Sequence, residues 1–189
     1  HTMCFVAKTK DQKLKEIADE ILKCQECKVD RVGVAVVGEG NSDADVVFIG
    51  EAPGRTEAEE GRPFIGRSGK LLRSLIVESG LKEEDVYITS PVKYLPVYIT
   101  PKPSDIAHGR IHLEKQLHVI EPKYIVLLGN TAITAVIGKK IPALTSHGTT
   151  MTEGNRTYYL TIHPAAAIRF QKFKKVIEED FKKLKTLLG

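Results

Sequence analysis

A short apolar run that ends at a glycine- and proline-rich segment is the most constraining feature of this sequence. Val46-Val47-Phe48-Ile49 has the composition of a strand that is buried on both faces. The next segment, Gly50-Glu51-Ala52-Pro53-Gly54, breaks that strand and places a carboxylate directly after it. Open α/β sheets bind their ligands beyond the carboxyl ends of their parallel strands. Glu51 is therefore a candidate active-site residue, on a loop that is expected to continue to Gly66.

Strand-like and helix-like segments alternate along the rest of the chain. Buried strands are predicted at 45–50, 86–89, 124–129 and 157–162, with a weaker candidate at 32–37. Apolar residues at helical spacing predict helices at 11–23, 68–79, 104–120 and 131–137, and a long one after Pro164. This alternation predicts a three-layer α/β/α sandwich with a central, mainly parallel sheet.

The overall composition is that of a soluble, globular protein. Apolar residues make up 42% of the 189 residues and charged residues 28%. No apolar run reaches the roughly 18 residues that span a bilayer, and no signal segment is recognisable, so a cytoplasmic location is expected. The net charge of +4 is a modest bias toward anionic partners that does not establish nucleic-acid binding. Residues 3–189 are expected to form a single domain, and 1–2 are interpreted as the remnant of a tag.

Three polar residues directly follow predicted strands. Glu51, Ser90 and His163 each lie one or two residues beyond a strand end. Because the carboxyl ends of parallel strands meet at one edge of the sheet, these side chains are expected to line one cleft. The alternatives are a solvated loop carboxylate for Glu51 and a capping role for His163 at a strand–helix junction.

Four motifs occur in order: Gly50-Glu51-Ala52-Pro53-Gly54, Gly61-Arg62-Pro63-Phe64-Ile65-Gly66, Leu128-Gly129-Asn130-Thr131-Ala132 and His163-Pro164-Ala165. Together they resemble the uracil-DNA glycosylase superfamily, most closely its family 4, the thermostable iron–sulfur branch. The resemblance implies a hydrolase that starts base excision repair. Such an enzyme flips uracil, or a related deaminated base, out of DNA and hydrolyses its N-glycosidic bond.

The resemblance also implies roles for individual residues. Glu51 and His163 match the catalytic positions, where the histidine donates to the departing base. Phe64 matches the aromatic that stacks on the flipped base, beside base-binding positions at Gly50, Ala52 and Ser90. A loop that enters the DNA matches Ala166 to Arg169, with Ile168 as a candidate wedge and Arg169 as a phosphate contact.

The sequence departs from the family pattern at the base-reading position. Ser90 stands where the family has an asparagine, whose amide reads the polar edge of uracil. A hydroxyl can donate and accept, but it cannot make the same two-point contact. The preferred base is therefore left open.

The ligands of the family's [4Fe-4S] cluster are also incomplete. Cys24 and Cys27 match the first pair of cysteines, but Tyr94 and about His108 stand at the other two positions. Cys4 is a candidate third thiolate, with His108 or His112 as the fourth ligand. Three outcomes stay open: an intact cluster, loss of the cluster with packing in its place, and a zinc ion.

Two other functions compete with a monomeric glycosylase that needs no protein partner. One is a DNA-binding paralogue with weakened or lost catalysis, which Ser90 and the missing cluster ligands would signal. The other is a flavodoxin-like nucleotide-binding module. The absence of GxGxxG and GxxxxGK[ST] motifs after any strand counts against that module.

Overall fold

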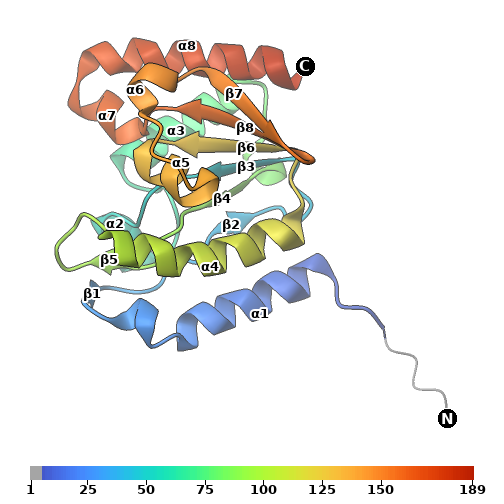
Figure 1. Cartoon of the computed structure of the whole chain (residues 1–189), viewed down its shortest axis with the longest axis vertical. Coiled ribbons are helices and arrows are strands. Elements are labelled where there is room, and N and C mark those ends of the chain that lie inside the picture. The colour runs from blue at the N-terminus through green and yellow to red at the C-terminus, as the bar shows by residue number, and fades with distance from the viewer. Residues whose placement is uncertain (1–5) are drawn as a thin grey trace.

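A six-stranded sheet forms the centre of the structure, a computed structural model that describes residues 6–189 (Figure 1). From one edge to the other, its strands are β2 (Glu39–Gly40), β4 (Tyr87–Thr89), β3 (Val46–Ile49), β6 (Tyr124–Leu128), β8 (Arg156–Thr161) and β7 (Thr149–Glu153). The four central strands run parallel, whereas β2 and β7 pair antiparallel at the edges. The expected α/β fold with a mainly parallel sheet is confirmed.

Helices cover both faces of the sheet. One face carries α3 (Arg67–Glu78), α7 (Pro164–Arg169) and α8 (Gln171–Leu188), which contact one another. On the other face, α4 (Pro103–Ile120) packs against α5 (Asn130–Ile137) and, on its outer side, against α1 (Lys10–Lys23), which is the lowest helix in Figure 1. Shorter elements are η1 (Glu26–Lys28), α2 (Arg55–Glu60), η2 (Glu83–Asp85), α6 (Ala143–Ser146) and a small sheet of β1 (Arg31–Val32) with β5 (Leu95–Pro96).

The core lies between the central strands and the two helical layers. Val47, Phe48 and Ile49 of β3 are fully buried because helices cover both faces of the strand. Phe48 stacks on Phe181 of α8, with ring centroids 6.1 Å apart. Full burial of each large apolar side chain contributes about 1.5–3 kcal/mol, so this strand anchors the residues that follow it.

The strand order creates the crevice in which the functional residues lie. After β3 the chain crosses to β4 on one side, and after β4 it crosses to β6 on the other side of β3. The crossovers therefore diverge between β3 and β6, and their carboxyl ends leave a gap where ligands bind in α/β sheets. In Figure 1 these ends point toward α2 and α7.

Several local predictions were wrong. The expected loop at 51–66 contains α2, and the expected strand at 32–37 is reduced to β1. β7 was not predicted because all its residues are exposed, so it lacks an apolar alternation. The helix predicted at 104–120 begins one residue earlier, at Pro103.

The long helix expected after Pro164 is two helices. Phe170 has extended backbone angles (φ −130°, ψ 114°) and separates α7 from α8. Its side chain is 47% exposed. The segment from Ala166 to Arg169, expected to be a loop, is therefore part of a short helix.

Within residues 6–189, no helix is both long and apolar enough to span a membrane. The single-domain organisation stays a prediction, and the suggested tag remnant lies outside the described residues.

Candidate active site

A cavity of about 310 Å³ opens at the carboxyl ends of the central strands. Glu51, Ser90 and His163, which follow β3, β4 and β8, all line it, together with Ala52 and Phe64. The expected convergence of these polar side chains is therefore present.

His163 is held in one tautomer by the start of α7. The backbone N–H of Ala165 donates to Nδ1 of His163 at 3.0 Å, so that nitrogen carries no proton. Burial lowers the pKa of His163, although the negative charges of Glu51 and Glu57 oppose this effect. The ring is therefore neutral near pH 7 and carries its proton on Nε2. A Cβ atom on Gly50 would stand 3.7 Å from Nε2, which places this donor close to the end of β3.

Glu51 is fixed by the neighbouring strand–helix junction. The hydroxyl of Thr131, in the first turn of α5, donates a short hydrogen bond to Oε2 of Glu51. The backbone carbonyl of Glu51 accepts from the N–H of Val92 at 3.3 Å, which joins the segments after β3 and β4. A carboxylate held in this way is available to a water molecule or to a developing positive charge.

Phe64 is positioned by an unusual backbone and by close contacts with glycines. Its φ is +49°, a left-handed conformation that a non-glycine residue adopts at a cost. Arg73 stabilises it by donating to the carbonyl of Phe64 at 2.8 Å and to that of Pro63 at 2.7 Å. The ring lies over Gly50, where a Cβ atom would come within 2.4 Å of Cζ. It also stacks on His163, with centroids 5.7 Å apart.

Glu57 closes the loop that carries Phe64. This buried side chain in α2 accepts from the backbone N–H groups of Ile65 and Gly66 at 2.9 and 2.8 Å. Two charge-assisted hydrogen bonds of this kind contribute about 1.5–3 kcal/mol each. Glu57 therefore holds the aromatic beside the cavity.

The hydroxyl of Ser90 donates its hydrogen bond to its own loop and not into the cavity. Its hydroxyl donates to the carbonyl of Val92 at 3.1 Å, and the residue is 5% exposed. Below it, Lys93 donates to the carbonyl of Ser90 at 2.6 Å, to Oγ1 of Thr89 at 2.8 Å and to Oε1 of Gln116 at 2.7 Å. Burial lowers the pKa of Lys93 to about 7, while these three acceptors favour its charged form. This network fixes the loop that bears Ser90.

The three candidate DNA-binding residues lie on α7, beside the cavity. Ala166 lines a neighbouring cavity that also touches Glu51 and His163. Ile168 is 39% exposed, and Arg169 is exposed with its guanidinium 5.3 Å from the ring centroid of Phe170. Ile168 and Arg169 do not line either cavity, but the helix that carries them has as its N-cap His163, which lines both.

Two cysteines and two histidines gather at a separate place, where α1 ends against α4. We refer to Cys24, Cys27, His108 and His112 as the Cys2His2 cluster; their ligand atoms all lie within 4.8 Å of one another. This group could hold a metal ion. Cys4 lies outside the described residues, so its suggested role as a ligand is not tested.

The family's [4Fe-4S] cluster does not fit these residues. Such a cluster takes four thiolates, and residues 6–189 supply two at this place. Tyr94, at the third family position, is instead packed with Ile17, Ile21 and Ala35, and the guanidinium of Arg31 lies 4.5 Å from its ring centroid. Tyr94 therefore packs in the core between α1 and the neighbouring loops and offers no thiolate to a cluster.

Several functional contacts were missed at the level of the sequence. Thr131, Glu57 and Lys93 were not singled out, because their roles depend on partners that are distant in the chain. The position of both His108 and His112 beside the two cysteines was also missed, although their spacing of four residues within a helix was a usable signal.

Comparisons with known proteins agree with this geometry. The family model described as "Uracil DNA glycosylase superfamily" matches residues 37–185. The type-4 uracil-DNA glycosylase of Saccharolobus solfataricus is 42% identical over 184 residues, which cover 92% of this chain and 85% of that protein. That of Thermotoga maritima is 36% identical over 187 residues, covering 95% and 97%, and that of Sulfurisphaera tokodaii is 37% identical over 185 residues, covering 92% and 84%. This chain therefore belongs to the uracil-DNA glycosylase superfamily.

Proposed function

We propose that this protein excises uracil from DNA by hydrolysing the bond between the base and its sugar. The observation that carries the proposal is the neutral His163, with Nε2–H near Gly50, in one cavity with Glu51 and Phe64. The relatives named above are type-4 uracil-DNA glycosylases, which supports the same activity. The flavodoxin-like alternative has no support from these matches.

The arrangement suits the charges that develop in this reaction. As the N-glycosidic bond breaks, its electron pair goes to N1 of uracil, and the sugar gains positive oxocarbenium character. Nε2–H of His163 donates to the uracil carbonyl on which the negative charge spreads. The carboxylate of Glu51 offsets the positive charge and orients the water whose oxygen bonds to C1′. One proton of that water passes to the uracil anion, so neutral uracil and a sugar hydroxyl are the products.

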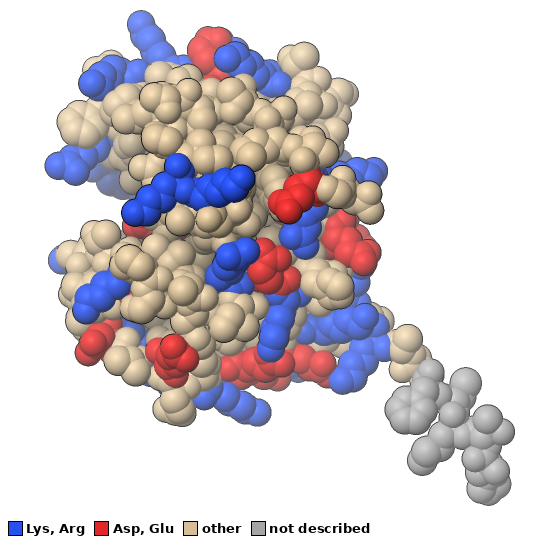
Figure 2. All heavy atoms as spheres, viewed as in Figure 1, with Lys and Arg blue, Asp and Glu red and all other residues tan. Residues whose placement is uncertain are grey.

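Access to uracil in a duplex requires that the nucleotide leave the base stack. Phe64 provides an aromatic surface for the flipped base, next to the backbone of Gly50 and Ala52. Ile168 on α7 is the apolar side chain that enters the vacated space, and Arg169 binds the adjacent phosphate. Figure 2 shows Lys and Arg spread over one face of the molecule with Asp and Glu between them. Because the described residues on the face in Figure 2 form no continuous basic surface, affinity for DNA is expected to depend on individual contacts such as that of Arg169 with a phosphate.

The hydrogen bond of Ser90 favours a second candidate function, a DNA-binding protein with weakened catalysis. While its hydroxyl donates to Val92, Ser90 offers the base an acceptor only. The site then lacks the two-point contact with which the family asparagine reads uracil.

One assay separates these functions. The full chain is incubated with labelled duplexes that carry a single uracil, hypoxanthine or xanthine, and abasic sites are then cleaved with alkali. We expect strand scission at uracil, and a loss of at least about 100-fold in the His163→Ala variant. Scission at none of the three bases, together with retained binding of the duplex, would establish the weakened DNA-binding protein instead.

A further inference from the structure

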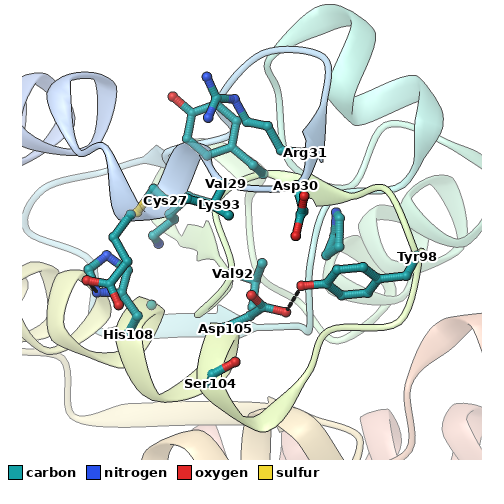
Figure 3. A pocket seen from close by; sticks show the side chains of 14 residues that line it. Cys27, Val29, Asp30, Arg31, Val92, Lys93, Tyr98, Ser104, Asp105 and His108 are labelled. Carbon is teal, nitrogen blue, oxygen red and sulfur yellow. Dashed lines mark hydrogen bonds and ion pairs between the residues drawn. The ribbon is translucent and has the colours of Figure 1, made fainter.

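The Cys2His2 cluster has the ligand spacing of a zinc site. Cys24 is the C-cap of α1 and Cys27 lies in η1, which gives the C-x2-C spacing, while His108 and His112 are one turn apart on α4. A C-x2-C pair combined with an H-x3-H pair is a frequent ligand set of tetrahedral structural zinc. Figure 3 shows Cys27 and His108 at one end of a cavity, away from Tyr98 at the other end.

The hydrogen bonds of His108 prepare one ring nitrogen for a metal. Its Nδ1 lies 3.1 Å from Oε2 of Glu26, and its Nε2 faces Sγ of Cys24 at 3.2 Å. A carboxylate that accepts from the far nitrogen of a histidine fixes the ring and the tautomer of a metal ligand. Glu26 therefore leaves Nε2 of His108 free to bind an ion between the histidine and the cysteine.

His112 supplies an independent sign that a ligand is expected. It is 6% exposed, and neither Nδ1 nor Nε2 has a hydrogen-bond partner among the described residues. A buried polar atom without a partner costs free energy, and nearly all such groups in proteins are paired. A metal ion bound to one nitrogen would remove part of this cost.

The distances favour one ion over an iron–sulfur cluster. In a four-iron cluster each ligand binds a different iron, and in a Rieske two-iron cluster the cysteines and histidines bind different irons. Both clusters keep cysteine and histidine donors apart by the width of the cluster. The 3.2 Å separation of Cys24 Sγ and His108 Nε2 is instead close to the roughly 3.3–3.8 Å expected between ligands of one tetrahedral zinc.

We propose that the Cys2His2 cluster binds a single Zn²⁺ in this protein, in the place of the iron–sulfur cluster of its family. The ion joins the end of α1 to α4. Gly109, beside His108 in α4, packs directly on Pro91, where a Cβ atom would come within 2.1 Å of the carbonyl oxygen. Zinc therefore fixes the helix that supports the loop bearing Ser90.

The first test is the metal content of the purified full chain. Zinc, iron and acid-labile sulfide are measured after extensive dialysis, both as purified and after incubation with zinc sulfate. We expect about one zinc per chain, without stoichiometric iron or sulfide. Iron together with sulfide, or no retained metal after incubation with zinc, would overturn the proposal.

Variants test the ligands. His112→Ala should lose the zinc, whereas His118→Ala, an exposed histidine on the same helix, should retain it. Glu26→Gln should retain the site with about 10- to 100-fold weaker zinc affinity, measured by competition with a chromophoric chelator. Retention of a full equivalent of zinc by His112→Ala would contradict the assignment.

Substitution with Co²⁺ gives a readout that needs neither activity nor a folded variant. Co²⁺ bound to the dialysed wild-type chain should show the intense visible bands of tetrahedral coordination and a thiolate charge-transfer band. Added zinc should abolish both. The weak spectrum of six-coordinate Co²⁺ would show that the four side chains do not form the site.

Discussion

The backbone N–H of Ala165 donates to Nδ1 of His163 at 3.0 Å and thereby decides which nitrogen of the imidazole carries the proton. The same contact makes His163 the N-cap of α7, the helix that bears the candidate DNA-binding residues. One hydrogen bond thus couples the proposed catalytic donor to the element that meets the DNA.

Protonation of His163 should reduce both activity and stability. If Nδ1 of His163 were protonated, it could no longer accept a hydrogen bond from the N–H of Ala165. The N-cap of α7 would therefore be lost. Burial lowers the pKa of His163 below the ordinary 6.5 of the unfolded chain. Below pH 6.5 the unfolded state therefore binds more protons than the folded state, and the free energy of unfolding falls as the pH decreases. Uracil excision should hold level from pH 8 to 6.5 and decline in more acidic solution.

The matched variant for this prediction is His163→Asn, since asparagine is a good N-cap that does not titrate in this range. It should keep the helix and lose part of the pH dependence of unfolding in urea. Its excision rate should be about 100- to 1000-fold lower, the typical cost of removing one donor to a developing anion. An unchanged slope of stability with pH would show that other groups cause it.

Thr131 should act as a positioning residue for Glu51. Thr131→Val keeps the shape of the side chain but removes the hydroxyl that donates to the carboxylate. A hydrogen bond to a charged group contributes about 1.5–3 kcal/mol, so the single-turnover rate should fall about tenfold to hundredfold. Affinity for the uracil duplex should not change. Thr131→Ser restores the donor and should recover most of the rate, whereas equal loss in both variants would indicate a packing effect.

Ser90→Asn should improve the recognition of uracil. The amide supplies a donor and an acceptor together, and a two-point contact with a base edge gives about 1–3 kcal/mol of discrimination. The rate on uracil should rise about tenfold to hundredfold over the wild-type chain. Ser90→Ala removes the hydrogen bond to Val92 and the single acceptor that the hydroxyl offers the base, and it should change the rate far less than Ser90→Asn. If both variants excise uracil at the wild-type rate, Ser90 does not determine specificity.

The sequence was sufficient to predict the layered fold because the central strands carry runs of buried, mainly apolar residues. β3 and β6 show this directly, with every residue from Val46 to Ile49 buried. The same rule could not find β7, whose five residues are exposed, or the break at Phe170, which no glycine or proline marks. Sequence patterns report burial, so exposed elements and unmarked bends give no signal.

The candidate site was predictable in part for the same reason. Glu51, Ser90 and His163 were found because strand ends in a parallel sheet converge. The direction of each side chain was not predictable. Ser90 donates to its own loop, and His112 lies beside Cys24 and Cys27, which are 88 and 85 residues earlier in the chain. Such contacts depend on the packing of α1 against α4, which no local pattern records.

Two glycine substitutions should show whether excision activity depends on the position of the Phe64 ring or on the stability of the whole fold. In Gly50→Ala the added Cβ would lie 2.4 Å from Cζ at the tip of the Phe64 ring, which can swing aside. In Gly69→Ala the Cβ would lie 2.0 Å from the carbonyl carbon of Phe64, where the backbone must move. We expect Gly50→Ala to lose excision activity with a nearly wild-type urea midpoint. Gly69→Ala should lower the free energy of unfolding by about 1–3 kcal/mol. The opposite pattern, with Gly50→Ala the less stable and Gly69→Ala the less active variant, would show that the ring of Phe64 is not the group that Gly50 accommodates.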